Sequence, residues 1–198
     1  MNEDDPVIGR RGSYAKGVAR RREILDRAIE VFAEQGAAGT SLRQIAQRIG
    51  VSNAALLHYF DSREQLLVAV FEHAERSRTP EAHHAARTAV EVLVDAAVRN
   101  VTLPGMVELY STLVAASLET SENSRRRFFV GRFDRVRADL VERLVRDQRA
   151  GRIRADVDAA EIAALLVAAS DGLQIQWLLE PSIDLERTMR TFAVLLAP

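Results

Sequence analysis

The sequence contains no cysteine, which excludes disulfide bonds, thiolate catalysis and cysteine-ligated zinc. It also lacks a long hydrophobic run. Apolar residues make up 47% of the 198 residues, yet no stretch approaches the ~20 apolar residues of a membrane span. The acidic residues near the start are unlike the basic start of a signal peptide. We therefore expect a cytoplasmic protein that does not contact the membrane.

The chain as a whole lacks an excess of positive charge, because 27 basic residues are balanced by 28 acidic ones and the formal net charge is −1. Proteins that bind nucleic acid usually show a basic footprint. The charge is distributed unevenly, however. Residues 10–63 contain ten basic and five acidic side chains, a balance of +5, whereas the rest of the chain carries −6. The N-terminal third can therefore attract phosphate although the whole chain is slightly acidic.

Strand patterns are missing as well. Apolar residues recur with the ~3.6-residue period of helices, and no stretch alternates apolar and polar residues for long. The predicted fold class is therefore all-α, with about nine helices. We expect a flexible basic arm over residues 1–17 and a three-helix, helix-turn-helix DNA-binding domain over residues 18–63. Residues 64–198 are predicted to form a helical dimerisation and ligand-binding domain.

Two short helices joined by a tight turn are predicted between residues 41 and 60. Ser41 and Gln44 have the spacing of a capping box, and Ser52 can cap the following helix. Gly50 supplies the left-handed residue that ends the first helix. The apolar positions that would fix the angle between the helices are Leu42, Ile45, Ala46, Ile49, Val51 and Leu56. This is the geometry that presents a helix to the major groove of DNA.

The polar side chains on the opposite face are candidate DNA contacts. They are Arg43, Gln44, Asn53 and His58. The helix N-termini at Ser41 and Ser52 would add a favourable dipole toward phosphate. Two alternatives remain open: Arg43 could touch only phosphate, and His58 could be a helix-end residue packed on Phe60.

The run Thr40 to Ala46, then Gly50-Val51-Ser52 and His58-Tyr59-Phe60, resembles the DNA-binding domain of the tetracycline-repressor (TetR) family. The resemblance covers about residues 22–71 and includes the upstream Ala28, Phe32 and Gly36. It implies a homodimer of nine or ten helices per chain. The last two helices, about 158–179 and 185–197, would form a four-helix dimer interface. It also implies that Tyr59 contacts phosphate and that Arg43, Ser52, Asn53 and Ala55 face the DNA.

The chain departs from the family pattern at three positions. Leu57 stands where an aromatic residue is frequent, Ala54 where a glycine or small polar residue is, and Arg63 where a lysine is. Arg63 can still reach a phosphate. The two adjacent alanines offer only methyl contacts, so base readout is expected to depend on Asn53, Arg43 and DNA shape. The candidate DNA-binding residues are Thr40, Ser41, Arg43, Gln44, Ser52, Asn53, Ala55, His58, Tyr59 and Arg63.

The C-terminal helices contain a candidate effector site. Small-molecule pockets are mainly apolar with a few polar anchors. The candidate lining residues are Met106, Tyr110, Phe129, Phe133 and Trp177, each with core packing as the alternative role. Asp171, Gln174 and Gln176 are unusual polar residues in an apolar helix, and one of them could anchor a ligand or pair across a dimer. We expect a small-molecule effector that is apolar or amphipathic.

Together these features predict a ligand-responsive transcriptional repressor. A homodimer would set two recognition helices ~34–36 Å apart on a palindromic, double-stranded operator. The effector would favour a dimer with the wrong helix separation. One alternative is a ligand-independent DNA-binding co-regulator or activator. The least favoured is a helical enzyme, because the sequence has no nucleophile elbow, phosphate loop or HExxH pattern. We expect no catalytic residue, cofactor or metal.

Three further groups of basic residues each allow a functional and a purely structural interpretation. The basic residues 9–17 could enter the minor groove or form a solvated tail. Three histidines, His73, His83 and His84, could suggest a metal site, but consecutive histidines diverge by about 100° on a helix, so surface histidines are favoured. The run Arg125-Arg126-Arg127 could serve an anionic ligand or merely face solvent at a helix start, where positive charge is unfavourable.

Overall fold

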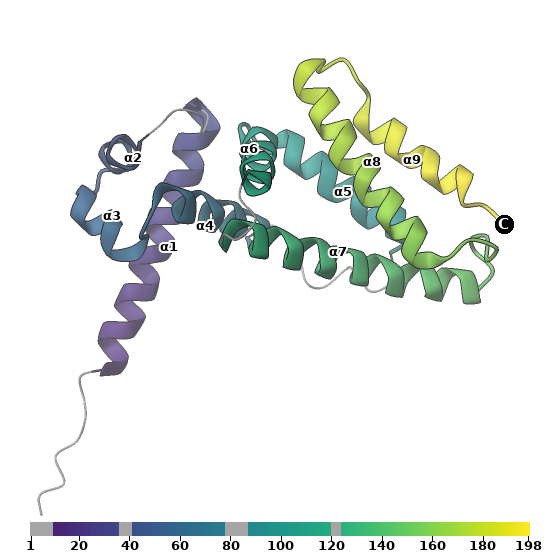
Figure 1. Cartoon of the computed structure of the whole chain (residues 1–198), viewed down its shortest axis with the longest axis horizontal. Coiled ribbons are helices and arrows are strands. Elements are labelled where there is room, and N and C mark those ends of the chain that lie inside the picture. The colour runs from purple at the N-terminus through teal and green to yellow at the C-terminus, as the bar shows by residue number, and fades with distance from the viewer. Residues whose placement is uncertain (1–9, 36–40, 78–86, 120–123) are drawn as a thin grey trace, which may run out of the picture.

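The computed structural model describes residues 10–35, 41–77, 87–119 and 124–198, and these residues form nine α-helices and no strand. The helices are α1 (Arg10–Gln35), α2 (Leu42–Arg48), α3 (Asn53–Tyr59), α4 (Arg63–Arg76), α5 (Ala89–Thr102), α6 (Met106–Leu118), α7 (Ser124–Arg149), α8 (Ala159–Leu179) and α9 (Leu185–Leu195). The predicted all-α class is confirmed. In Figure 1, α1 to α3 lie at one end of the molecule and α5 to α9 form a larger group at the other, with α4 running between them.

The first helix begins earlier than the sequence suggested. Helical periodicity placed its start at Val18, whereas α1 begins at Arg10 and projects beyond the α2–α3 unit (Figure 1). Residues 10–17 of the predicted arm therefore belong to a helix, and residues 1–9 lie outside the described residues. Gly12 and Gly17 suggested flexibility, but a glycine costs a helix only about 1 kcal/mol. A helix that is already formed downstream can absorb that cost, since propagation adds one hydrogen bond per residue.

Two glycines with positive φ shape the turns. Gly50 has φ +72° after α2, as predicted for the helix-turn-helix. Gly105 has φ +74° and occupies the N-cap position of α6. Proline is typical of the first turn of a helix, so the sequence alone predicts Pro104 in the first turn of α6. Pro104 instead lies one residue before the cap, and Pro104 and Gly105 together form the turn between α5 and α6.

The first of two cores crosses the predicted domain boundary. Buried apolar residues of α1 to α4 pack in one continuous cluster with residues of α6 and α7. Ile24, Ile45 and Leu56 represent the N-terminal side, whereas Leu109 and Phe129 represent the C-terminal side, and each is at most 2% exposed. Helix α4 packs against helices on both sides of the boundary predicted at residue 63. That boundary stays a prediction.

The second core joins α5, α7, α8 and α9. Its buried members include Val94, Leu140, Leu166 and Met189. Helix α8 is the one described helix that is long and apolar enough to cross a membrane, and about a third of its apolar window is buried in this chain. Helix α8 therefore carries more apolar side chains than the core of this chain buries. The remaining apolar surface needs a separate explanation.

Candidate nucleic-acid and effector sites

Local hydrogen bonds build the α2–turn–α3 unit. The Ser41 backbone N–H donates to Gln44 Oε1 at 2.8 Å, and the Gln44 N–H donates to Ser41 Oγ at 3.3 Å, completing the predicted capping box. At the start of α3, the Ala55 N–H donates to Ser52 Oγ at 3.0 Å. The Val51 N–H closes the turn on the Ala46 carbonyl at 2.9 Å. Both helix starts are therefore fixed by residues no more than five positions apart.

The unit presents its polar residues outward. Exposed side chains are Ser41, Arg43, Gln44, Ser52, Asn53 and His58, whereas Ala55, Tyr59 and Arg63 are half-buried. Thr40 lies outside the described residues. The hydroxyls of Ser41 and Ser52 and the amide of Gln44 already serve as helix caps. Helix α3 thus has an accessible outer face, as a recognition helix requires.

Two predicted contact residues have neighbours within the chain. The His58 ring lies edge-on to the Tyr59 ring, with centroids 5.0 Å apart. Arg63 Nη1 lies 3.8 Å from Glu64 Oε1. Both contacts are compatible with an outward role, because an edge contact leaves the imidazole nitrogens accessible and an exposed ion pair is weak.

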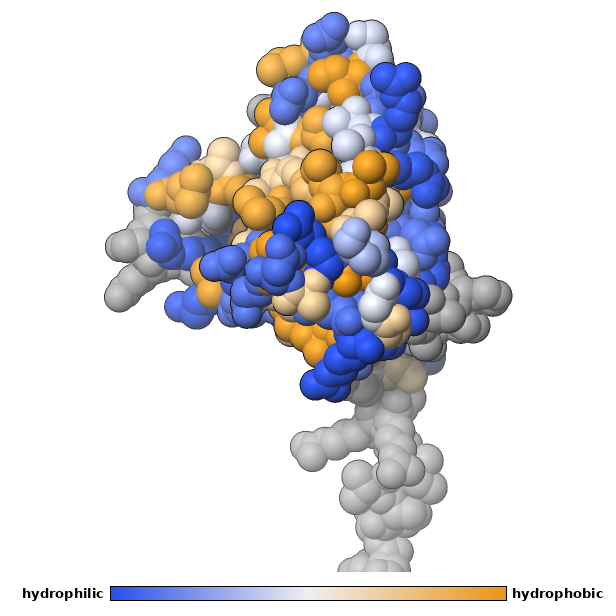
Figure 2. Space-filling model, turned by 90° about the vertical axis from the view of Figure 1, so that its right-hand side faces the viewer, coloured by the Kyte–Doolittle hydropathy of each residue, from blue (hydrophilic) through white to orange (hydrophobic). Residues whose placement is uncertain are grey.

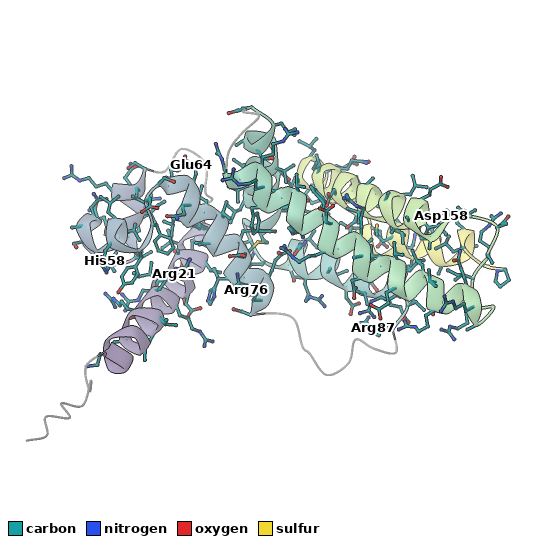
Figure 3. The ribbon with its side chains drawn as sticks, turned by 60° about the horizontal axis from the view of Figure 1, so that its bottom comes forward. Arg21, His58, Glu64, Arg76, Arg87 and Asp158 are labelled. Atoms are coloured by element: carbon teal, nitrogen blue, oxygen red, sulfur yellow. The ribbon has the colours of Figure 1, made fainter. Side chains whose placement is uncertain are left out.

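In the sequence, the arginines of α1 were counted only toward the positive charge of residues 10–63. Two of them also brace the helix-turn-helix. Arg27 Nη1 donates to the Ile49 carbonyl at the end of α2, at 3.0 Å. The guanidinium of Arg21 lies 5.1 Å from the centre of the Phe60 ring, which follows α3. Figure 3 places Arg21 on α1 near the α3 end that carries His58. Part of the local positive charge therefore holds α2 and α3 against α1.

The predicted effector residues fall into two groups. Met106, Tyr110 and Phe129 are 4%, 7% and 2% exposed and share the first core. Tyr110 also stacks on Phe71 of α4, with ring centroids 5.4 Å apart. Phe133 is partly buried and packs against this core and against the second one. Trp177 is half-buried and packs against the second core alone. The structure thus separates Trp177 from the other four candidates.

The polar residues of α8 bind other helices of the same chain. Tyr110 Oη donates to Asp171 Oδ2 at 2.9 Å, linking α6 to α8. Burial raises the pKa of the Asp171 carboxyl above its ordinary value. Asn100 Nδ2 on α5 donates to Gln174 Oε1 at 2.9 Å, and Gln174 Nε2 donates to the Ser170 carbonyl at 3.1 Å. Gln176, in contrast, is exposed.

Sequence reasoning missed an ion pair between α4 and α7. Arg132 Nη2 donates to Glu75 Oε1 at 2.6 Å, and Arg132 Nε lies 3.1 and 3.2 Å from the two Glu75 oxygens. The Arg132 side chain is only 15% exposed. The available signal was its position one residue before Phe133 and three after Phe129, within the apolar stripe of α7. An arginine within an apolar stripe needs a partner for its charge, and Glu75 is that partner here.

The histidine and arginine clusters carry no assigned role. His73 Nε2 lies 2.6 Å from Asp26 Oδ1, which ties α4 to α1. His83 and His84 lie outside the described residues, and the described part of the chain contains no metal-competent cluster of three His, Asp or Glu residues. Arg125 to Arg127 occupy the first turn of α7, so their use by an anionic ligand stays a prediction.

An apolar surface remains uncovered on the last two helices. Its large exposed residues are Leu165, Ile175 and Leu179 on α8 and Val194 and Leu195 on α9, with exposures from 48% to 84%. In Figure 2, apolar side chains gather in the upper part of the view, where Figure 1 places these helices. Contiguous apolar patches of this kind mark interaction surfaces in soluble proteins.

Known proteins match both parts of this architecture. Residues 24–70 match the family described as bacterial regulatory proteins, tetR family. Residues 107–197 match the family described as BetI-type transcriptional repressor, C-terminal. The HTH-type transcriptional repressor AcnR of Corynebacterium diphtheriae is 31% identical over 156 residues, which cover 77% of this chain and 78% of the relative. The HTH-type transcriptional regulator BetI of Brucella anthropi is 30% identical over 171 residues, covering 79% and 80%.

A solved structure supports the same assignment. A transcriptional regulator from Saccharomonospora viridis, in complex with choline, superposes with a TM-score of 0.70 at 25% identity, covering 89% of this chain and 94% of that one. Sequence likeness to AcnR and BetI extends well beyond the helix-turn-helix into the C-terminal helices. The chain therefore belongs to the TetR family of transcriptional regulators, which are DNA-binding proteins and not enzymes.

Proposed function

We propose that this chain is a ligand-responsive repressor that binds a palindromic operator as a homodimer and is released by a small molecule. One observation carries the proposal: the core that supports α2 and α3 continues through α4 into the aromatic cluster of α6 and α7. A change in that cluster must therefore be accommodated by the helix that supports the DNA-binding unit. Cytoplasmic location is part of the proposal, since the operator is cellular DNA.

The DNA-binding part of the proposal uses the outward residues of α2 and α3. Asn53 and Arg43 would read bases, and Tyr59 and Arg63 would contact phosphate. The N-terminal turns of α1 would add sequence-independent contacts, because they project beyond α3 and are rich in basic residues (Figure 1).

The dimer would form through α8 and α9. Exposed leucine and isoleucine side chains on α8, among them Leu165 and Ile175, would be buried against the same residues of a second copy, as an isologous interface requires. This burial also accounts for the apolar composition of α8 without a membrane. The exposed Gln176 could pair across the interface, whereas Asp171 and Gln174 already have partners within the chain.

The effector would bind among the rings of α4, α6 and α7. Phe71, Tyr110 and Phe129 come from these three helices and are almost fully buried. An apolar or amphipathic ligand must separate them to enter, and separating them moves α4. Asp171 is a candidate polar anchor, because burial leaves its carboxyl with the Tyr110 hydroxyl as the one hydrogen-bond donor that the structure describes. Choline in the Saccharomonospora viridis regulator supports a small-molecule effector of this chain.

The test is fluorescence anisotropy with the DNA upstream of this protein's own gene and with a scrambled duplex, at several salt concentrations. We expect preferential binding to the upstream DNA that weakens steeply with salt. Asn53→Ala should reduce the preference, whereas Gln47→Ala, at an exposed position of α2 outside the candidate set, should not. If every duplex binds equally, an operator selection from genomic DNA decides. Failure there would overturn the proposal, and operator binding without any ligand response would favour the co-regulator or activator.

A further inference from the structure

We propose that Arg132 is a positioning residue for DNA binding: it fixes α4, and with it the α2–α3 unit, relative to the C-terminal helices. The proposal rests on DNA binding by α2 and α3, but it does not depend on the effector or on the dimer interface. Arg132 lies on α7, outside the helix-turn-helix and outside every residue predicted to touch DNA or ligand.

The first support is the geometry of the ion pair. Arg132 directs two guanidinium nitrogens at the Glu75 carboxylate, with distances of 2.6 to 3.2 Å. A forked pair of this kind fixes direction as well as distance. Glu75 lies in the last turns of α4, close to the junction between the two halves of the molecule. The pair therefore restrains the part of α4 where a small rotation displaces the DNA-binding end most.

The second support is the aromatic packing of the same guanidinium. Arg132 lies 5.3 Å from the centre of the Phe71 ring and 5.1 Å from the centre of the Tyr110 ring. Phe71 and Glu75 are four residues apart and so share one face of α4. Arg132 thus contacts two successive turns of α4 and one residue of α6. A single side chain defines how three helices meet.

The third support is the chemistry of the surrounding core. The hydrophobic driving force between helices is non-directional and does not by itself select among small rotations of α4. A guanidinium that is 15% exposed cannot follow such rotations, because losing Glu75 would leave its charge poorly solvated. The pair therefore favours one angle of α4 over neighbouring angles that would preserve the apolar contacts.

The same chain of contacts continues to α8. The Tyr110 ring lies under Arg132, and the Tyr110 hydroxyl donates to Asp171. Glu75, Arg132, Tyr110 and Asp171 thus connect α4, α7, α6 and α8 in sequence. A shift of α8 would reach α4 through these side chains, which gives Arg132 a place in any response that begins in the C-terminal helices.

The experiment measures how well the position of the α2–α3 unit is fixed relative to α7. The chain has no cysteine, so two introduced cysteines can carry spin labels without background labelling. Gln47→Cys on α2 and Glu142→Cys on α7 are both at exposed positions. Pulsed electron paramagnetic resonance would measure the distance between the two labels. Diluting the labelled protein in unlabelled protein ensures that both labels belong to one chain. We expect one narrow distance distribution, which broadens in Arg132→Gln and in Glu75→Gln. Arg137→Gln, which removes an exposed ion pair with Asp134 on the same helix, is the matched control and should leave it narrow.

Affinity for the duplex that the unsubstituted protein prefers supplies the second readout. Arg132→Gln and Glu75→Gln should each weaken binding roughly tenfold, and the double variant should be no weaker than either single. Arg132→Lys retains charge without the fork and should be intermediate. If Arg132→Gln does not fold, Glu75→Gln and Arg132→Lys carry the test. Unchanged narrow distances in folded variants, or additive losses of affinity, would overturn the proposal. If no duplex is preferred, the repressor proposal fails. The label-to-label distances would still show whether Arg132 fixes the α2–α3 unit relative to α7.

Discussion

The helix-turn-helix and the C-terminal domain are held together over different sequence distances. In the α2–α3 unit, each capping hydrogen bond joins residues three positions apart, such as Ser52 and Ala55. In the C-terminal domain, the polar links join residues 61 and 74 positions apart, Tyr110 with Asp171 and Asn100 with Gln174. The caps of the first unit are set by near neighbours in the sequence, although Arg27 and Arg21 of α1 also brace it. The second depends on helices that meet only in the folded chain. This difference suits the proposed function, in which the α2–α3 unit binds DNA and the C-terminal domain responds to an effector.

The largest expected effect would come from charging the surface that we assign to the dimer. Ile175 is 48% exposed on α8, so Ile175→Glu should leave the single chain folded while placing two carboxylates in the interface. We expect a monomer by light scattering and a loss of operator affinity of more than about 100-fold, because two linked half-site contacts become independent. The α2–α3 unit itself should be unaffected.

A matched control sharpens that comparison. Leu118 on α6 is 72% exposed and lies outside α8 and α9, so Leu118→Glu should change neither mass nor affinity. A dimer that survives Ile175→Glu would show that another surface forms the interface.

Sequence reasoning succeeded where partners are close in the chain. The capping box of Ser41 and Gln44, the Ser52 cap and the left-handed Gly50 were all predicted, because each depends on residues within one or two turns. The start of α1 was misjudged for a related reason: Gly12 and Gly17 suggested a flexible arm, and local pattern does not show that a downstream helix extends through them.

Sequence reasoning failed where partners are distant. The pair Arg132 and Glu75 is separated by 57 positions, and a lone arginine in an amphipathic helix is most often solvated. Trp177 was grouped with the effector aromatics by residue type, yet it packs in the other core. Which helices become neighbours is a property of the whole fold, so no local pattern contained this information.

A second prediction examines the local side of the comparison. Ser52→Ala removes the Oγ that accepts the Ala55 N–H at 3.0 Å, and loss of an N-cap typically costs about 1 kcal/mol. Urea unfolding should show that decrease in the free energy of unfolding. Ser182→Ala, in the turn before α9, removes a hydroxyl that donates to the exposed Glu180 and should cost less than about 0.5 kcal/mol. Equal losses would mean that the Ser52 cap contributes nothing special to the α2–α3 unit.

The smallest effect concerns the buried carboxyl on the global side. Because burial raises the pKa of Asp171, the folded protein holds this proton more tightly than the unfolded chain does. The free energy of unfolding should therefore fall as pH rises through the interval between the ordinary carboxyl pKa and the raised one. Asp171→Asn can still accept the Tyr110 hydrogen bond but cannot titrate. Its stability relative to the unsubstituted protein should therefore rise through the same interval.

A companion variant decides which force sets that pH dependence. The Tyr110 hydroxyl favours the charged form of Asp171, in opposition to burial, so Tyr110→Phe should enlarge the loss of stability with rising pH. Urea unfolding of the three proteins at intervals from pH 4 to pH 8 measures both effects. If Asp171→Asn gains no stability over the unsubstituted protein as pH rises, water reaches Asp171 in the folded chain. The contact between α6 and α8 would then be less tightly packed than the α2–α3 unit, and an effector could enter there. If the gain appears and Tyr110→Phe enlarges it, the two helices meet in a dry contact that a ligand must open, and opening it is the step that would reach α4.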